Sequence, residues 1–135
     1  MSLVFFGCSK SGEISAIEEA IRLELEKPKG ELPQEHYLGL KKLSVYRTGR
    51  PVTDISLLNE MPNLEELDFA SGDISDPAPL AKLRVLALNG NRIKDTSPLS
   101  GLKSLKWVNL MGNPISEQAI EDLKKALPGC KIEHD

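Results

Sequence analysis

The sequence predicts an α/β fold, namely a short solenoid with a parallel β-sheet on its concave face and a helical cap at each end. Two observations support this prediction. A block of the form LxxLxLxxN recurs, with variations, between residues 40 and 115. Segments with helical periodicity flank these blocks on both sides. The 135-residue chain is long enough for one domain with a real core and too short to expect two.

Composition narrows the range of functions. The chain has 17 Lys and Arg against 20 Asp and Glu, a net charge of -3, so no global field favours nucleic acid or an anionic membrane. We therefore expect no nucleic-acid partner. No apolar run approaches the roughly 18 residues that a membrane span needs, so we also expect no transmembrane segment.

Residues 1–12 form a tail or a residual signal segment. Phe5-Phe6-Gly7-Cys8-Ser9 resembles the end of a bacterial lipoprotein signal, in which Cys8 would carry the lipid anchor. The apolar part is shorter than such signals usually have, and an ordinary N-terminal tail or strand is the alternative. The first interpretation places the protein outside the bacterial cytoplasm, in the periplasm or at the cell surface. The second is compatible with the cytoplasm.

Residues 13–39 are expected to cap the first repeat. Apolar residues recur at helical spacing through residues 13–27, Ser11 or Gly12 can cap the helix, and Pro28 with Gly30 ends it. Glu18 and Arg22 form a favourable i, i+4 pair. A solenoid needs such a polar-faced lid over the apolar end of its first turn.

Residues 40–115 contain the repeats. The fourth positions of successive blocks are 24, 19 and 22 residues apart, at Leu43, Leu67, Leu86 and Val108. Asn91 and Asn113 occupy the turn position of the last two blocks, whereas Thr48 and Gly72 replace them in the first two. We therefore expect the first two corners to be looser than the last two, because an Asn side chain can bond otherwise unpaired backbone groups.

Residues 116–135 are expected to form the C-terminal cap. Ser116 can cap a helix whose apolar side carries Ile120, Leu123 and Leu127, and Pro128-Gly129 ends it. Residues 130–133 could then run beside the last strand as a polar edge.

With this register, residues 40–115 resemble the leucine-rich repeats of bacterial internalin-like proteins. The third block matches best, because its residues from Asn91 to Leu102 follow the pattern NxIxDxxPLxxL. Asp54 and Asp76 repeat the Asp95 position, where a carboxylate can cap the helical turn that follows. The resemblance implies recognition of another protein by the concave strand face.

Alternation along each strand predicts which side chains form that face. Three lateral rows result: Lys42, Glu66, Val85 and Trp107; Ser44, Asp68, Ala87 and Asn109; and Tyr46, Ala70, Asn89 and Met111. The first half of the surface is charged, and we interpret it mainly as a solvated face of mutual pairs. The second half is apolar, with Trp107 as a candidate anchor. Packing of Trp107 against the C-terminal cap is the alternative.

We therefore predict a non-catalytic protein–protein interaction module with no cofactor and no metal site. The sequence contains no glycine-rich phosphate loop, GxSxG, HExxH or CxxC motif. The competing hypothesis is a structural or surface-display part of a bacterial lipoprotein without a high-affinity partner. A monomer is favoured over a homo-oligomer.

The lipoprotein interpretation is testable by mass spectrometry of protein isolated from its native host. It predicts a chain that begins at Cys8 and carries the added mass of an acyl anchor. An unmodified Cys8 with residues 1–7 still attached contradicts it.

Overall fold

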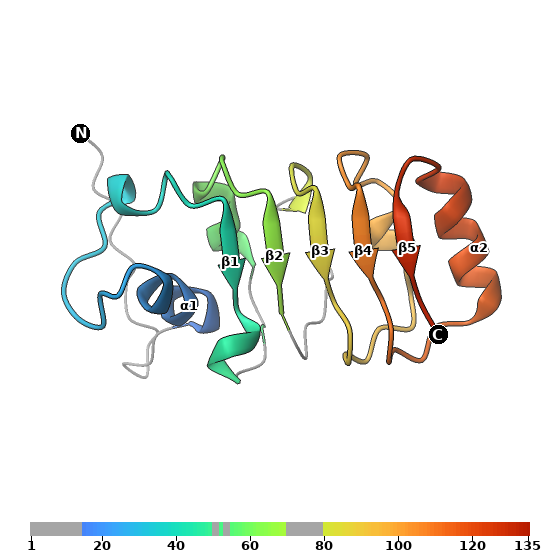
Figure 1. Ribbon diagram of the computed structural model, residues 1–135, viewed down its shortest axis with the longest axis horizontal. Coiled ribbons are helices and arrows are strands. Elements are labelled where there is room, and N and C mark those ends of the chain that lie inside the picture. Colours follow the sequence, from blue (N-terminus) through green and yellow to red (C-terminus); the bar gives the residue numbers. More distant parts are fainter. Residues whose placement is uncertain (1–14, 50–51, 53–54, 70–79) are drawn as a thin grey trace.

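Five short parallel strands lie side by side and form one sheet along the long axis of the molecule (Figure 1). The computed structural model describes residues 15–49, 52, 55–69 and 80–135. The strands are β1 (Lys42–Ser44), β2 (Glu66–Asp68), β3 (Val85–Ala87), β4 (Trp107–Asn109) and β5 (Lys131–Glu133), in that order across the sheet. This sheet confirms the predicted fold class.

In the described residues, short 3₁₀ turns lie before β1 and in the connections from β1 to β2 and from β3 to β4, whereas a helix lies between β4 and β5 (Figure 1). These turns are η1 (Gln34–His36), η2 (Tyr46–Thr48), η3 (Ser56–Glu60) and η5 (Ser97–Leu99). Before η5, the Asp95 carboxylate accepts a hydrogen bond of 2.9 Å from the Ser97 backbone N–H. Hydrogen bonds from Ser97 also lower the pKa of Asp95. The predicted capping role is confirmed for Asp95, while Asp54 and Asp76 lie outside the described residues.

The N-terminal cap helix, α1 (Ala16–Glu24), is shorter than the predicted helix over residues 13–27. Its N-cap is Ser15 rather than Ser11 or Gly12, because the Ser15 hydroxyl accepts the Glu18 backbone N–H at 3.0 Å. The predicted pair between Glu18 and Arg22 is present at 2.9 Å. Arg22 also donates to the carbonyls of Lys27 and Gly30, so it ties the following connection to the helix.

The C-terminal cap agrees with the sequence in both its parts. Ser116 caps α2 (Glu117–Ala126) by accepting the Ala119 backbone N–H at 3.2 Å. After the helix, β5 pairs in parallel with β4, as expected for residues 130–133. The cap therefore contributes a fifth strand to the sheet as well as a helix beside it (Figure 1).

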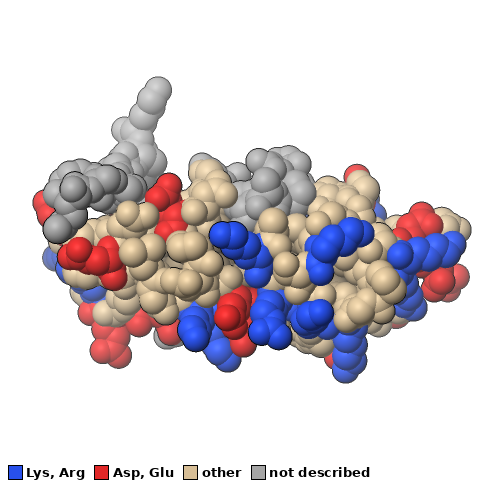
Figure 2. Space-filling model, turned by 90° about the horizontal axis from the view of Figure 1, so that it is seen from above, with Lys and Arg blue, Asp and Glu red and all other residues tan. Residues whose placement is uncertain are grey.

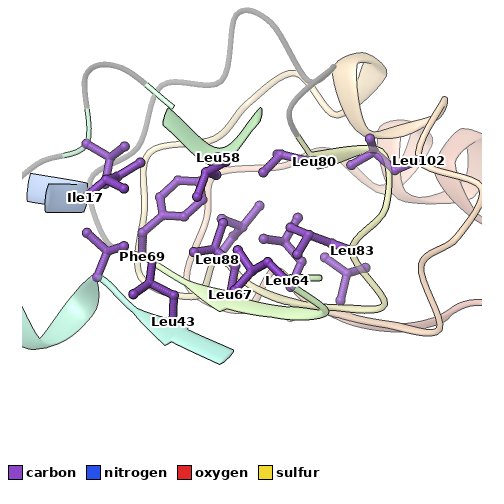
Figure 3. Close-up of a cluster of buried hydrophobic side chains, with 14 of the residues drawn as sticks. Ile17, Leu43, Leu58, Leu64, Leu67, Phe69, Leu80, Leu83, Leu88 and Leu102 are labelled. Atoms are coloured by element: carbon purple, nitrogen blue, oxygen red, sulfur yellow. The ribbon is translucent and has the colours of Figure 1, made fainter. Parts of the chain in front are cut away.

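Aliphatic side chains stacked between the sheet and the return segments form the core (Figure 3). The strand register places Leu43, Leu67, Leu86 and Val108 in one lateral row, and all four are buried. Buried residues two positions later in each block form a second row: Val45, Phe69, Leu88 and Leu110. Each turn of the solenoid thus buries its apolar residues against those of its neighbours.

The two asparagine corners join successive turns of the solenoid. The Asn113 amide donates to the carbonyls of Leu110 and Leu88, both at 2.9 Å, and its oxygen accepts the Ile93 N–H at 3.0 Å. The Asn91 amide likewise donates to Leu88 in its own turn and to Phe69 in the preceding one. At the first corner, Thr48 donates to Val45 in its own turn. Gly72 lies outside the described residues.

We predict that Asn113→Ala lowers the free energy of unfolding by about 2–3 kcal/mol, because truncation leaves buried backbone groups without partners. Urea unfolding measures this change. The matched control is Asn59→Ala on the exposed surface of η3, which should stay within about 0.5 kcal/mol of wild type. Equal effects of the two substitutions would contradict the role given to the corner.

Candidate binding face

The strand register forms the predicted lateral rows and extends them onto the cap. The first row runs Lys42, Glu66, Val85 and Trp107, and Lys131 of β5 continues it. The second runs Ser44, Asp68, Ala87 and Asn109, and Glu133 continues it. The cap therefore supplies two charged side chains to the face, which the sequence prediction had confined to the repeats.

The third predicted row lies beyond the strand ends, and its described members are exposed. Tyr46 is 63% exposed and Met111 is 45% exposed. Asn89 lies between them in sequence order and is also exposed, while Ala70 lies outside the described residues. Tyr46 and Met111 therefore present large accessible side chains at this edge of the sheet.

A shallow hollow of about 210 Å³ adjoins the third row, and sequence reasoning did not predict it. Its walls are formed by Tyr46, Asp68, Phe69, Ala87 and Asn89. The sequence feature that could have indicated the hollow is the small side chain of Ala87, which lies next to Asp68 in the same lateral row. Because the hollow combines an aromatic side chain with polar groups, it can accept a small side chain of a partner.

The first half of the face contains one ion pair and one hydrogen-bonded carboxylate. The Lys42 Nζ lies 3.0 Å from the Glu66 Oε2. Both side chains are solvent-exposed, so their ion pair contributes little to stability. The Asp68 carboxylate accepts the Ser44 hydroxyl at 2.8 Å and the Tyr46 backbone N–H at 3.2 Å. Of the charges in this half, Lys42 and Glu66 thus form the predicted kind of mutual pair, while Asp68 is held by uncharged groups.

In the second half, Trp107 lies between Val85 and Lys131 in the lateral row and is half-buried. Hydrogen bonds from Lys131 and then from the Trp107 side chain lower the pKa of Glu133. Trp107 is therefore neither fully exposed nor covered by the cap. Its side chain is partly accessible on the face and interacts with Glu133 of the cap strand.

A further row, just before the strands, was not part of the sequence prediction. The backbone joins Lys41 to Glu65, Glu65 to Arg84, and Arg84 to Lys106 by hydrogen bonds of 2.8–2.9 Å. The side chains of Lys41, Arg84 and Lys106 are exposed. Figure 2 looks down on the edge where the strands begin and shows Lys and Arg along it. The apolar second half of the face therefore has a basic border.

The described residues do not suggest a metal site or a membrane span. They contain no group of three or more His, Cys, Asp or Glu that could hold a metal ion. None of their helices is long and apolar enough to cross a membrane. Cys130 is a half-buried free thiol, and its burial raises its pKa although nearby Lys106 acts in the opposite direction. Cys8 lies outside the described residues.

Comparison with solved structures identifies similar repeat folds. An internalin C2 from Listeria monocytogenes is 26% identical with a TM-score of 0.68, and the match covers 87% of this chain and 52% of that one. A leucine-rich repeat protein of Leptospira interrogans is 28% identical with a TM-score of 0.51, and the match covers 62% of this chain and 22% of that one. The chain thus spans about half the length of the first structure and about a fifth of the second.

A structure of the Chaetomium Mex67:Mtr2 subunits is 22% identical with a TM-score of 0.50, and the match covers 69% of this chain and 78% of that one. This similarity concerns the fold alone. No family model and no curated protein matches the sequence. The fold is an internalin-like leucine-rich repeat fold, in agreement with the resemblance inferred from the sequence.

The contact between Trp107 and Glu133 gives a pH-dependent signal. Because the pKa of Glu133 is lowered, its hydrogen bonds are intact above the ordinary glutamate value of about 4.3 and are lost as the pH falls below it. Trp107 is the only tryptophan, so its fluorescence should titrate with a midpoint below that value. Glu133→Gln should abolish this transition, whereas Glu121→Gln on the exposed surface of α2 should leave it unchanged. A midpoint at or above 4.3 would contradict the contact.

Proposed function

We propose that this chain is a non-catalytic protein-interaction module that binds a protein partner through the concave face of β1–β5. The observation that carries this proposal is the lateral pair of Val85 and Trp107. The two side chains lie on adjacent strands of one sheet, partly accessible, with charged side chains on either side in the same row. A central apolar pair with a polar rim is typical of protein interfaces.

The platform beneath this pair supports the proposal. Leu86 and Val108, which directly follow Val85 and Trp107, are buried in the core, so the strands have little freedom to shift. A preformed face loses less entropy on binding than a flexible one. Truncation of an aromatic anchor in such a face commonly costs about 2 kcal/mol or more.

The structural comparisons support a binding role in general. Both bacterial structures are repeat proteins, and parallel stacking of repeats creates the extended surface that such proteins use for recognition. The chain covers only part of each, so their individual partners are not carried over to it.

A photo-reactive amino acid at Ala87 tests which face is used. Incubated with extract of the source organism, this variant should crosslink a defined partner, because Ala87 lies in the second row of the concave face. The matched control places the same group at Asn59, on η3. A partner captured at Asn59 and not at Ala87 would overturn the proposal, and so would the absence of any specific crosslink, which the structural-display hypothesis predicts.

The contribution of Trp107 is measured with the partner so identified. Trp107→Ala should weaken binding about 30-fold, the equivalent of about 2 kcal/mol, with the fold retained by circular dichroism. Unchanged affinity in a folded variant would exclude Trp107 as the anchor.

A further inference from the structure

Positive charge is concentrated in the third and fourth turns of the solenoid. Residues 80–113 contain six Lys and Arg residues and a single acidic residue, Asp95. The whole chain has 17 basic and 20 acidic residues, so 11 basic and 19 acidic residues remain for the rest. A chain of net negative charge therefore carries a distinctly basic segment at the proposed binding face.

Within this segment, three cations near the start of β3 and β4 form no ion pair with any residue that the structure describes. They are Lys82, Arg84 and Lys106, and all three are exposed. Neighbouring cations are engaged: Lys103 donates to the Ala126 carbonyl at the end of α2 at 2.7 Å, and Lys131 pairs with Glu133 at 3.0 Å. Lys82, Arg84 and Lys106 thus form a group of exposed cations at one edge of the face.

These charges directly precede the apolar pair. Arg84 comes just before Val85, and Lys106 just before Trp107. The Lys106 backbone N–H donates to the Arg84 carbonyl at 2.8 Å, so the two cations are lateral neighbours just as Val85 and Trp107 are. Each of the two strands is therefore preceded by a cation and begins with an apolar side chain on the face.

We propose that the edge formed by Arg84, Lys106, Val85 and Trp107 binds an acidic peptide segment of the partner. Its carboxylates would meet Arg84 and Lys106, and an apolar side chain of the same segment packs against Trp107. This inference rests on the proposed function and specifies the chemistry of its partner.

An acidic peptide fits this edge better than a nucleic acid does. Three carboxylates border the site: Glu65 and Glu66 on the β2 side, and Glu133 on the β5 side. A phosphate backbone extending past the two central strands would meet these negative charges, whereas a short peptide can place its carboxylates on the cations alone. The apolar pair also offers a contact for a peptide side chain.

A displayed library of random 12-residue peptides, selected on the intact chain, provides the probe. The enriched peptides should combine Asp or Glu with an apolar side chain, and a synthetic peptide from this set should bind more weakly as salt rises. The double variant Arg84→Glu and Lys106→Glu should weaken its binding at least tenfold.

The matched control is Arg92→Glu with Lys94→Glu. Both residues are exposed and belong to the same basic segment, but they follow the corner at the other end of β3. This control should change affinity less than twofold, so it separates the local edge from the general charge of the chain. Circular dichroism of both double variants checks that they fold.

Three results would overturn the inference: enriched peptides without acidic residues, equal losses in the two double variants, or displacement of the peptide by a dT20 oligonucleotide at similar concentration. The Ala87 crosslink distinguishes this failure from failure of the proposed function. If the crosslink survives the Arg84 and Lys106 substitutions, the concave face binds a partner but not through this edge.

Discussion

In each turn of the solenoid, one buried strand residue stacks on its counterpart in the next turn. This stacking determines which side chains point outward on the concave face. Leu67 and Leu86 pair across β2 and β3, and Val108 follows on β4. Because side chains alternate along a strand, a slip of one residue would exchange Val108 for Trp107 and bury the indole among leucines. The core therefore fixes which side chains can reach a partner. The asparagine corners reinforce this register, since Asn113 bonds carbonyl groups of two successive turns.

The same register gives the two halves of the face different distributions of charge. In β1 and β2, Lys42 and Glu66 lie beside one another in the first row and form an ion pair. In β3 and β4, the corresponding positions hold Val85 and Trp107. The cations just before them, Arg84 and Lys106, form no ion pair with any described residue, although Glu65 is the lateral neighbour of Arg84. A chain with a net charge of -3 can thus present a basic edge beside an apolar pair. The net charge of a chain therefore does not by itself show which charged partners a local surface can bind.

The fold could be predicted from the sequence because the spacing of core leucines specifies the strand register whatever the length of the connections. Local signals were less decisive: Ser11 and Ser15 are both good caps, and only the Ser15 contact with Glu18 selects the true start of α1. The basic edge was missed because the predicted rows began at the strand positions, although the register that places Val85 beside Trp107 also places Arg84 beside Lys106. The partial burial of Trp107 and its interaction with Glu133 could not be predicted, because no repeat motif specifies that β5 places Glu133 there.

The contribution of β5 implies that the cap is part of the face and not only a lid over the core. Lys131 continues the row of Trp107, and Glu133 interacts with the Trp107 side chain. Lys103, which lies between η5 and β4, in turn donates to the Ala126 carbonyl at the end of α2. The second half of the face therefore depends on both the repeats and the cap, and loosening of α2 would disturb Trp107 before it disturbed Tyr46 on the far side. A binding site placed there is coupled to the integrity of the C-terminal end of the solenoid.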